Sequence, residues 1–138
     1  MREILFKGKR VDNGEWVEGY YGIKGKDTDL ETHCIIKSNL NTNGSDFLYF
    51  NDIDVIPETV GQYTGLNDNY NTKIFEGDCL KLENYIIGFV VYDEKEGCFV
   101  FQEHEGESIN NYDETIIDRV PMNHYSVRNL RIIGNIHQ

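Results

Sequence analysis

The sequence predicts an all-β protein, built from short antiparallel strands that form a barrel or two small barrel-like lobes. Alanine, the best helix former, is absent, whereas Ile and Val supply 24 residues and Tyr and Phe another 16. These β-branched and aromatic side chains favour strands. Asn and Gly together supply 27 of the 138 residues, and both favour the tight turns that connect antiparallel strands. A chain of this length buries a sizeable core without disulfides or metals.

A β-hairpin is predicted at the start of the chain. Ile4–Val11 and Glu15–Gly22 are strand-like runs, and Asp12-Asn13-Gly14 joins them. Asn-Gly between two such runs is a strong hairpin signal because both residues tolerate a positive φ. After the hairpin, a short strand is predicted between two loops rich in polar residues and glycine, in the order Gly25–Glu31, Cys34–Ile36 and Ser38–Asp46.

A second group of strands follows in the middle of the chain. The run from Leu48 to Ile56 predicts a strand, and Pro57 ends it because proline is confined to the ends and edges of strands. Residues 1–138 are interpreted as a single domain, in which two lobes would meet near Pro57. The next hairpin has a strand, a turn and a return strand, at Thr59–Thr64, Asn67–Thr72 and Lys73–Phe75.

The last third of the chain predicts four further strands, Cys79–Leu82, Ile86–Tyr92, Cys98–Phe101 and Leu130–Ile136. Between the last two of these strands, Gln102–Asp113 is predicted to be an acidic loop, whereas Tyr112–Val120 fits either a strand or a short helix. About ten short strands at spacings of roughly 8 to 12 residues are typical of all-β barrels and sandwiches.

The charge of the chain argues against several classes of function. Thirteen basic and 24 acidic residues give a net charge of -11. This charge repels phosphate backbones and anionic membranes, so direct nucleic-acid binding is disfavoured. No apolar run approaches the ~20 residues that cross a bilayer, and the N-terminal segment lacks the pattern of a signal peptide. We therefore expect a cytoplasmic protein without membrane contact.

The cysteines and histidines do not suggest a cofactor. Cys34, Cys79 and Cys98 are far apart and odd in number, and the four histidines are scattered. This pattern fits neither a disulfide framework nor a zinc site. We expect reduced thiols packed in the core, no metal and no other cofactor.

The candidate binding surface is the loop-bearing edge of the second hairpin, where six side chains are expected to converge: Gln62, Tyr63, Thr64, Asp68, Glu76 and Asp78. Two roles remain open for the polar members of this set. They either satisfy backbone N–H groups in tight turns or contact a partner. Glu76 and Asp78 flank Gly77, so they could also bind a cation or exchange protons. No residue is assigned a catalytic or metal-binding role.

Three parts of the sequence carry a resemblance to a known family: Met1–Lys9 with Gly14–Tyr20, Ile56–Leu66 with Lys73–Asp78, and Ile132–Ile136. Together they resemble the YopX family of phage and prophage proteins, from end to end. The family has glycine in the turn where this chain has Asn71, and asparagine is the next best residue for a left-handed backbone. It has Ile-Val where this chain has Cys79-Leu80, which favours an apolar role for Cys79. The resemblance implies a mainly β fold encoded by phage or prophage genomes of bacteria, and therefore a location in the bacterial host cell. It supplies no established activity.

The resulting functional hypothesis is an accessory phage or prophage protein of unknown biochemical function, most simply a non-enzymatic module that binds an unknown host or phage protein. An alternative is an acidic mimic of nucleic acid that inhibits a host DNA-binding enzyme. An enzyme that acts on a nucleotide or sugar through Glu76 and Asp78 and a structural component of the virion are further alternatives. Self-association is left open.

Overall fold

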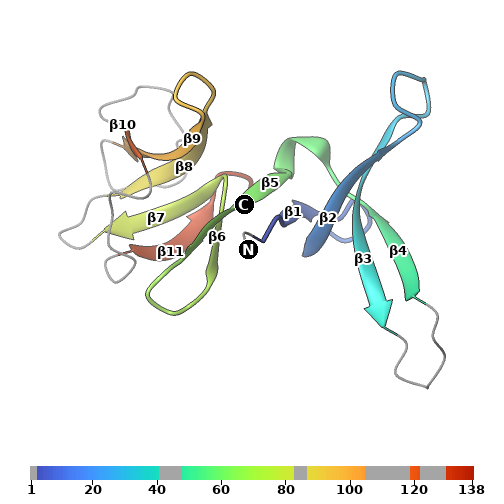
Figure 1. The fold of residues 1–138 in the computed structure, drawn as a ribbon, viewed down its shortest axis with the longest axis horizontal. Coiled ribbons are helices and arrows are strands. Elements are labelled where there is room, and N and C mark those ends of the chain that lie inside the picture. The colour runs from blue at the N-terminus through green and yellow to red at the C-terminus, as the bar shows by residue number, and fades with distance from the viewer. Residues whose placement is uncertain (1–2, 41–47, 83–86, 105–118, 122–129) are drawn as a thin grey trace. The chain divides into compact units, whose positions relative to one another are not determined.

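The structure is a computed structural model that describes residues 3–40, 48–82, 87–104, 119–121 and 130–138. Its regular elements are strands, apart from one short 3-10 helix within the described residues (Figure 1). The prediction of an all-β fold is confirmed. The chain divides into two compact units, Met1–Gln62 and Tyr63–Gln138, and each is described by itself.

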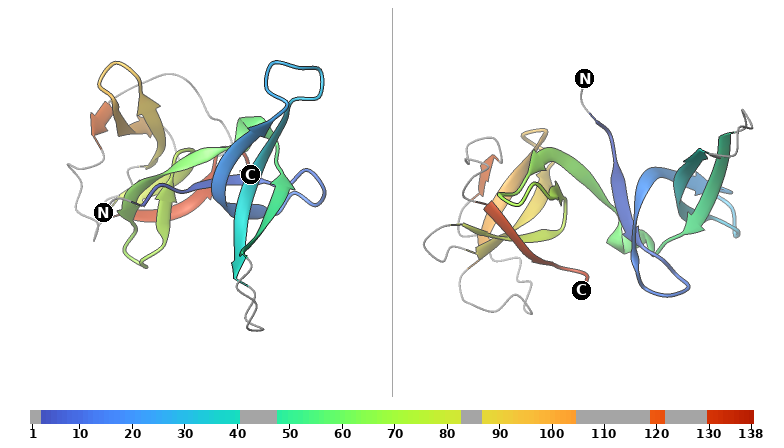
Figure 2. Two further views of the ribbon diagram at one scale, coloured as in Figure 1. Left: turned by 45° about the vertical axis from the view of Figure 1, so that its right-hand side comes forward. Right: turned by 90° about the horizontal axis from the view of Figure 1, so that it is seen from below.

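The first unit contains four complete strands, the 3-10 helix and the beginning of a fifth strand. They are β1 (Phe6–Lys9), β2 (Trp16–Lys24), β3 (Thr32–Leu40), β4 (Leu48–Asp54), η1 (Pro57–Thr59) and β5 (Gly61–Asn67). The sheet order is β4-β3-β2-β1-β5, with antiparallel pairing between neighbours. Figure 2 shows β2, β3 and β4 side by side. Beyond the ends of β1 and β4, an isolated bridge between Arg10 and Val55 makes the run β4-β3-β2-β1 curl back on itself.

The predicted first hairpin is confirmed. β1 pairs with β2, and Lys9 and Trp16 are the last pair before the turn. Gly14 adopts a φ of 71° in that turn. One face of these strands supplies the core of the first unit. Its buried side chains are Val17, Ile35 and Val55, and four partly buried residues pack on them: Phe6, Tyr21, Ile53 and Val60.

Several boundaries in the first unit differ from those predicted by a few residues, and the differences at β3 and at Thr59 change the assignment of a segment. β3 continues to Leu40 because Ser38–Leu40 pair with the beginning of β4, so main-chain pairing outweighs their polar composition. The remainder of that predicted loop, residues 41–46, lies outside the described residues. Thr59 belongs to η1 and not to a strand, because its hydroxyl donates to the Ile56 carbonyl and accepts the N–H of Lys9.

The second unit contains the rest of β5 and six further strands. They are β6 (Lys73–Phe75), β7 (Asp78–Leu82), β8 (Ile87–Asp93), β9 (Cys98–His104), β10 (Arg119–Pro121) and β11 (Leu130–Asn135). β6 pairs with β5, and the other five form an antiparallel sheet in the order β10-β9-β8-β7-β11 (Figure 1). The core of this unit consists of Ile74, Leu80, Leu82, Val90, Phe101 and Leu130.

The strands predicted for the second unit are confirmed, with boundaries that shift by a few residues. Gln102–His104, expected in the acidic loop, extend β9 and pair with β8. Residues 105–118 lie outside the described residues, so only Arg119 and Val120 of the stretch predicted as strand or helix are described, and both belong to β10. The described strands form no closed barrel.

Candidate functional site

The six residues predicted to form a binding edge are divided by the boundary between the units. Gln62 ends the first unit, where it is half-buried and lies opposite Phe6 of β1. The other five residues belong to the second unit. Tyr63 and Phe75 pair across β5 and β6, with their ring centroids 5.6 Å apart, and the Tyr63 hydroxyl donates to Oδ1 of Asn67. Tyr63 is therefore largely a packing residue of this hairpin.

Asp68 organises the turn of the second hairpin. Its side chain is only 4% exposed, and its Oδ1 accepts the N–H groups of Tyr70 and Thr72, each at 2.9 Å. Its Oδ2 accepts the N–H of Ile132 in β11 at 3.3 Å. This arrangement allows Asn71 to adopt a φ of 62°, the left-handed conformation expected for it. Asp68 thus connects the turn to the last strand.

Asp78 makes an equivalent connection at the next turn. It is fully buried, and its Oδ2 accepts the N–H of Phe75 at 2.8 Å. Its Oδ1 accepts a hydrogen bond from Nδ2 of Asn135 at 3.0 Å. Gly77, in the turn between β6 and β7, has a φ of 91°, and its carbonyl accepts the N–H of Ile136. Hence Asp78 connects the turn between β6 and β7 to the end of β11.

Thr64 also has a structural hydrogen bond, because its hydroxyl donates to the Ile74 carbonyl at 2.8 Å and accepts the N–H of Leu66. Glu76 is half-buried. The capping role weighed from the sequence therefore describes Thr64, Asp68 and Asp78. The binding role of the six residues of this edge stays a prediction.

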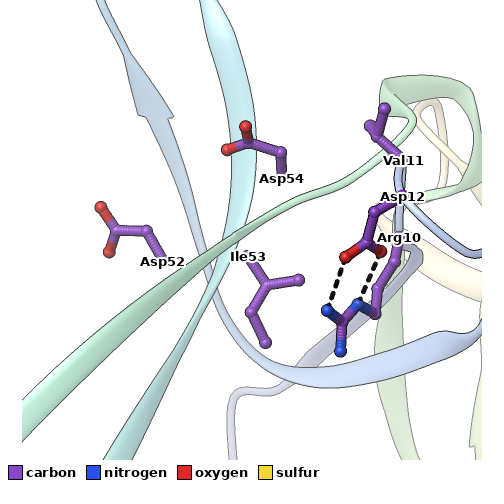
Figure 3. A pocket seen from close by; sticks show the side chains of 6 residues that line it. All are labelled: Arg10, Val11, Asp12, Asp52, Ile53 and Asp54. Atoms are coloured by element: carbon purple, nitrogen blue, oxygen red, sulfur yellow. Dashed lines mark hydrogen bonds and ion pairs between the residues drawn. The ribbon is translucent and has the colours of Figure 1, made fainter.

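A hollow of about 320 Å³ lies in the first unit, at a place where no sequence motif was identified. Arg10, Val11 and Asp12, at the turn after β1, form one wall, and Asp52, Ile53 and Asp54 of β4 form the other (Figure 3). Figure 3 shows Asp52 and Asp54 on one side of β4 and Ile53 on the other. The alternation of acidic and apolar residues in Asp52-Ile53-Asp54-Val55 is the sequence signal for this half-exposed strand.

The lining of the hollow carries three carboxylates and one guanidinium. Arg10 donates to Asp12 through Nε and a terminal nitrogen, at 2.9 and 2.7 Å, in a two-point interaction. This hydrogen bonding lowers the pKa of Asp12 and raises the pKa of Arg10. Lys24 approaches from β2, with Nζ 3.3 Å from Oδ1 of Asp54 and 3.8 Å from Oδ2 of Asp52. The hydrogen bond to Asp54 raises the pKa of Lys24.

Within the described residues, the edge of β4 that faces away from β3 is covered at one end and open at the other. Val55 donates its N–H to His33 in the direction of β3, whereas the Asp54 carbonyl accepts the N–H of Val11 on the opposite side. Ile56 in turn donates to the Lys9 carbonyl. Since main-chain groups alternate along a strand, the N–H and carbonyl of Asp52 also point away from β3. No described strand pairs with β4 on that side.

Other polar and sulfur-containing groups are integrated into the fold. Tyr21 and Nδ1 of His33 share a hydrogen bond, and Nε2 of His33 lies 3.6 Å from Glu31. Cys34 and Cys79 are free thiols that are 1% exposed, as predicted, whereas the free thiol Cys98 is half-buried. Burial, with a smaller effect of the Asp78 charge, raises the pKa of Cys79 to about 11.

In the part of the chain that the structure describes, no group of three His, Cys, Asp or Glu side chains is arranged to hold a metal ion. Within the same ranges, no helix is long and apolar enough to cross a membrane.

Comparison with known proteins gives one family assignment. No curated protein matches the sequence. The family model described as YopX protein matches residues 6–138, which include every described strand and all six residues of the predicted edge. The chain belongs to the YopX family.

Proposed function

We propose that this protein is a non-enzymatic protein-binding module, and that a partner chain adds as a strand to the open edge of β4. Its setting would be that of an accessory protein of a phage or prophage, as the family resemblance implies, in the cytoplasm of the bacterial host, as expected from the sequence. The observation that carries the proposal is the outward-facing main chain of Asp52, next to a hollow and at the end of a sheet.

The geometry of the first unit supports strand addition at this edge. Lys9–Val11 already pair with Asp54–Ile56. The chain itself therefore occupies this edge of β4 immediately after Asp52 and Ile53. That pairing stops at Asp12, where the chain turns back toward β2. An extended segment would continue the line of Lys9–Val11 along β4. Strand addition obtains affinity from main-chain hydrogen bonds and specificity from the pockets that alternate side chains enter.

The experiment uses a substitution that removes the outward-facing donor. Asp52→Pro deletes the N–H but leaves the pairing with β3, because proline is tolerated where the N–H of an edge strand faces solvent. Asp52→Ala keeps the N–H and serves as the matched control. We expect Asp52→Pro to lose the partners that the intact protein captures from host lysate, and Asp52→Ala to retain at least some of them. Far-UV circular dichroism and the melting temperature verify the fold of both variants.

A photo-crosslinking residue places the contact. Incorporated at the exposed Asn51, it is expected to link the captured partner, whereas the same residue at Leu30, which is 83% exposed, is not. Equal capture by Asp52→Pro and the unmodified protein, or crosslinks from Leu30 alone, would remove the β4 edge from consideration.

The edge predicted from the sequence has a separate test. We expect Glu76→Ala and Gln62→Ala to change the melting temperature only slightly, since neither residue is among the buried ones. If this edge is a second binding surface, either variant loses captured partners that Asp52→Pro retains. If both variants capture the same partners as the unmodified protein, Gln62 and Glu76 have no binding role and contribute only to the local structure.

A further inference from the structure

We infer that the strand added to β4 carries a lysine or arginine at the position opposite Asp52. This inference rests on the proposed function and specifies the chemistry of the partner. Its starting point is the pairing in the first unit, where Val11 lies opposite Asp54 along the same edge. Side chains of directly opposed residues lie on the same face of a sheet.

The face of β4 that the incoming residue would share is acidic. Asp52 and Asp54 are two residues apart on the strand, so both side chains lie on that face, as Figure 3 shows. Their side chains are 44% and 54% exposed. A residue opposite Asp52 would therefore have one carboxylate beside it, a second diagonal to it, and the exposed side chain of Val11 as its neighbour along the edge.

The chain itself demonstrates that these two carboxylates hold an ammonium group. Lys24 contacts one oxygen of Asp54 and one oxygen of Asp52 from the side of β2. Each carboxylate has a second oxygen that can accept further hydrogen bonds. An ammonium or guanidinium that arrives from the opposite side, the open edge, would share the same pair, while its aliphatic stem would pack on Val11.

Charge also decides against a second copy of this chain as the occupant. Antiparallel pairing of β4 with another β4 would bring Asp52 and Asp54 close to the same residues of the partner, and like charges directly across a sheet are destabilising. Each copy also has a net charge of -11. Acidic residues on an edge strand can instead serve only to prevent such pairing, and the experiment separates that protective role from binding.

The probes are fluorescent peptides in which Thr and Val alternate around a central residue that is Lys, norleucine or Glu. Binding is measured by fluorescence anisotropy, and the site by amide chemical shifts of the ¹⁵N-labelled full chain. We expect the Lys peptide to bind with shifts centred on residues 51–54, and the Glu peptide to bind roughly tenfold more weakly.

Three variants refine the measurement. The double substitution Asp52→Asn with Asp54→Asn is expected to lower the affinity for the Lys peptide about fivefold and to leave the affinity for the norleucine peptide unchanged. The control pair, Asp29→Asn with Glu58→Gln, removes the same charge from exposed positions outside the hollow and is expected to have little effect. Lys24→Met removes the competing ammonium and is expected to raise the affinity for the Lys peptide about two- to fivefold.

The possible outcomes separate this inference from the proposed function. Binding at β4 with equal affinity for the three peptides would overturn the inference and leave strand addition intact. Absence of binding by all peptides at about 1 mM, or shifts confined to other strands, would overturn both. Dimerisation of the full chain through β4 in sedimentation experiments would replace the basic partner with a second copy.

Discussion

Four aspartates show how differently the two units use the same side chain. In the second unit, Asp68 and Asp78 are 4% and 0% exposed, and every carboxylate oxygen accepts a hydrogen bond from the chain itself. In the first unit, Asp52 and Asp54 are about half exposed, and Lys24 contacts one oxygen of each. The buried pair therefore stabilises the fold, whereas the exposed pair is accessible to a partner.

Removal of the most buried carboxylate should have the largest effect. Asp78→Ala leaves the Phe75 N–H and the Asn135 amide without their acceptor inside the protein, which we expect to lower the free energy of unfolding by about 3 kcal/mol. Urea denaturation measures the change. Asp52→Ala is the matched control from the first unit, and an equal loss in both variants would contradict the distinction between the two pairs.

Asp68→Ala should have the next largest effect and lower the free energy of unfolding by about 2 kcal/mol. The loss is smaller because two of the N–H groups that donate to Asp68 lie in an exposed turn, where water can replace the carboxylate. The third donor, Ile132 N–H, connects that turn to β11, so hydrogen exchange of the Ile132 amide should accelerate. Unchanged exchange at Ile132 would show that the contact to β11 adds nothing to its protection.

Cys79, next to Asp78, adds a pH dependence. Burial raises the pKa of this thiol from 9.0 to about 11, so the folded state holds the proton at pH values where the unfolded chain has lost it. The resulting stability is fully present below pH 9 and is lost as the pH rises to about 11. When the pH rises from 8 to 10, the free energy of unfolding of the unmodified protein should therefore fall by about 1 kcal/mol more than that of Cys79→Val. Denaturation curves for both proteins at the two pH values provide the measurement, and parallel losses would show that Cys79 is not responsible.

Neutralising the exposed pair should have the smallest effect on the fold. Asp52→Asn with Asp54→Asn removes only interactions of exposed charges with Lys24, so the melting temperature should change by less than about 1 °C. Differential scanning calorimetry at low and moderate salt checks this expectation. A drop of several degrees would show that this pair is also structural, and would make any loss of peptide binding by the variant ambiguous.

The sequence predicted the turns better than the roles of the side chains. Asn13-Gly14 and Lys73–Phe75 were located correctly, because turn residues and strand residues act on their own backbone. The roles of Asp68 and Asp78 depend on Ile132 and Asn135, more than fifty residues away, and no local pattern contains that information. The hollow was missed for the same reason, since Arg10 and Asp54 come together through the pairing of Lys9–Val11 with Asp54–Ile56, which no local pattern contains.

The connections from the two buried aspartates to β11 also have a consequence for synthesis on the ribosome. The four complete strands of the first unit, and the part of β5 that belongs to it, are available once Gln62 has been translated, so this unit can fold while the rest of the chain is still being made. The second unit has to wait for Leu130–Asn135, the last strand to emerge, because Asp68, Asp78 and the whole of β7 bond to it. Until then, the apolar side chains of β6 to β8 remain exposed to chaperones and to other nascent chains.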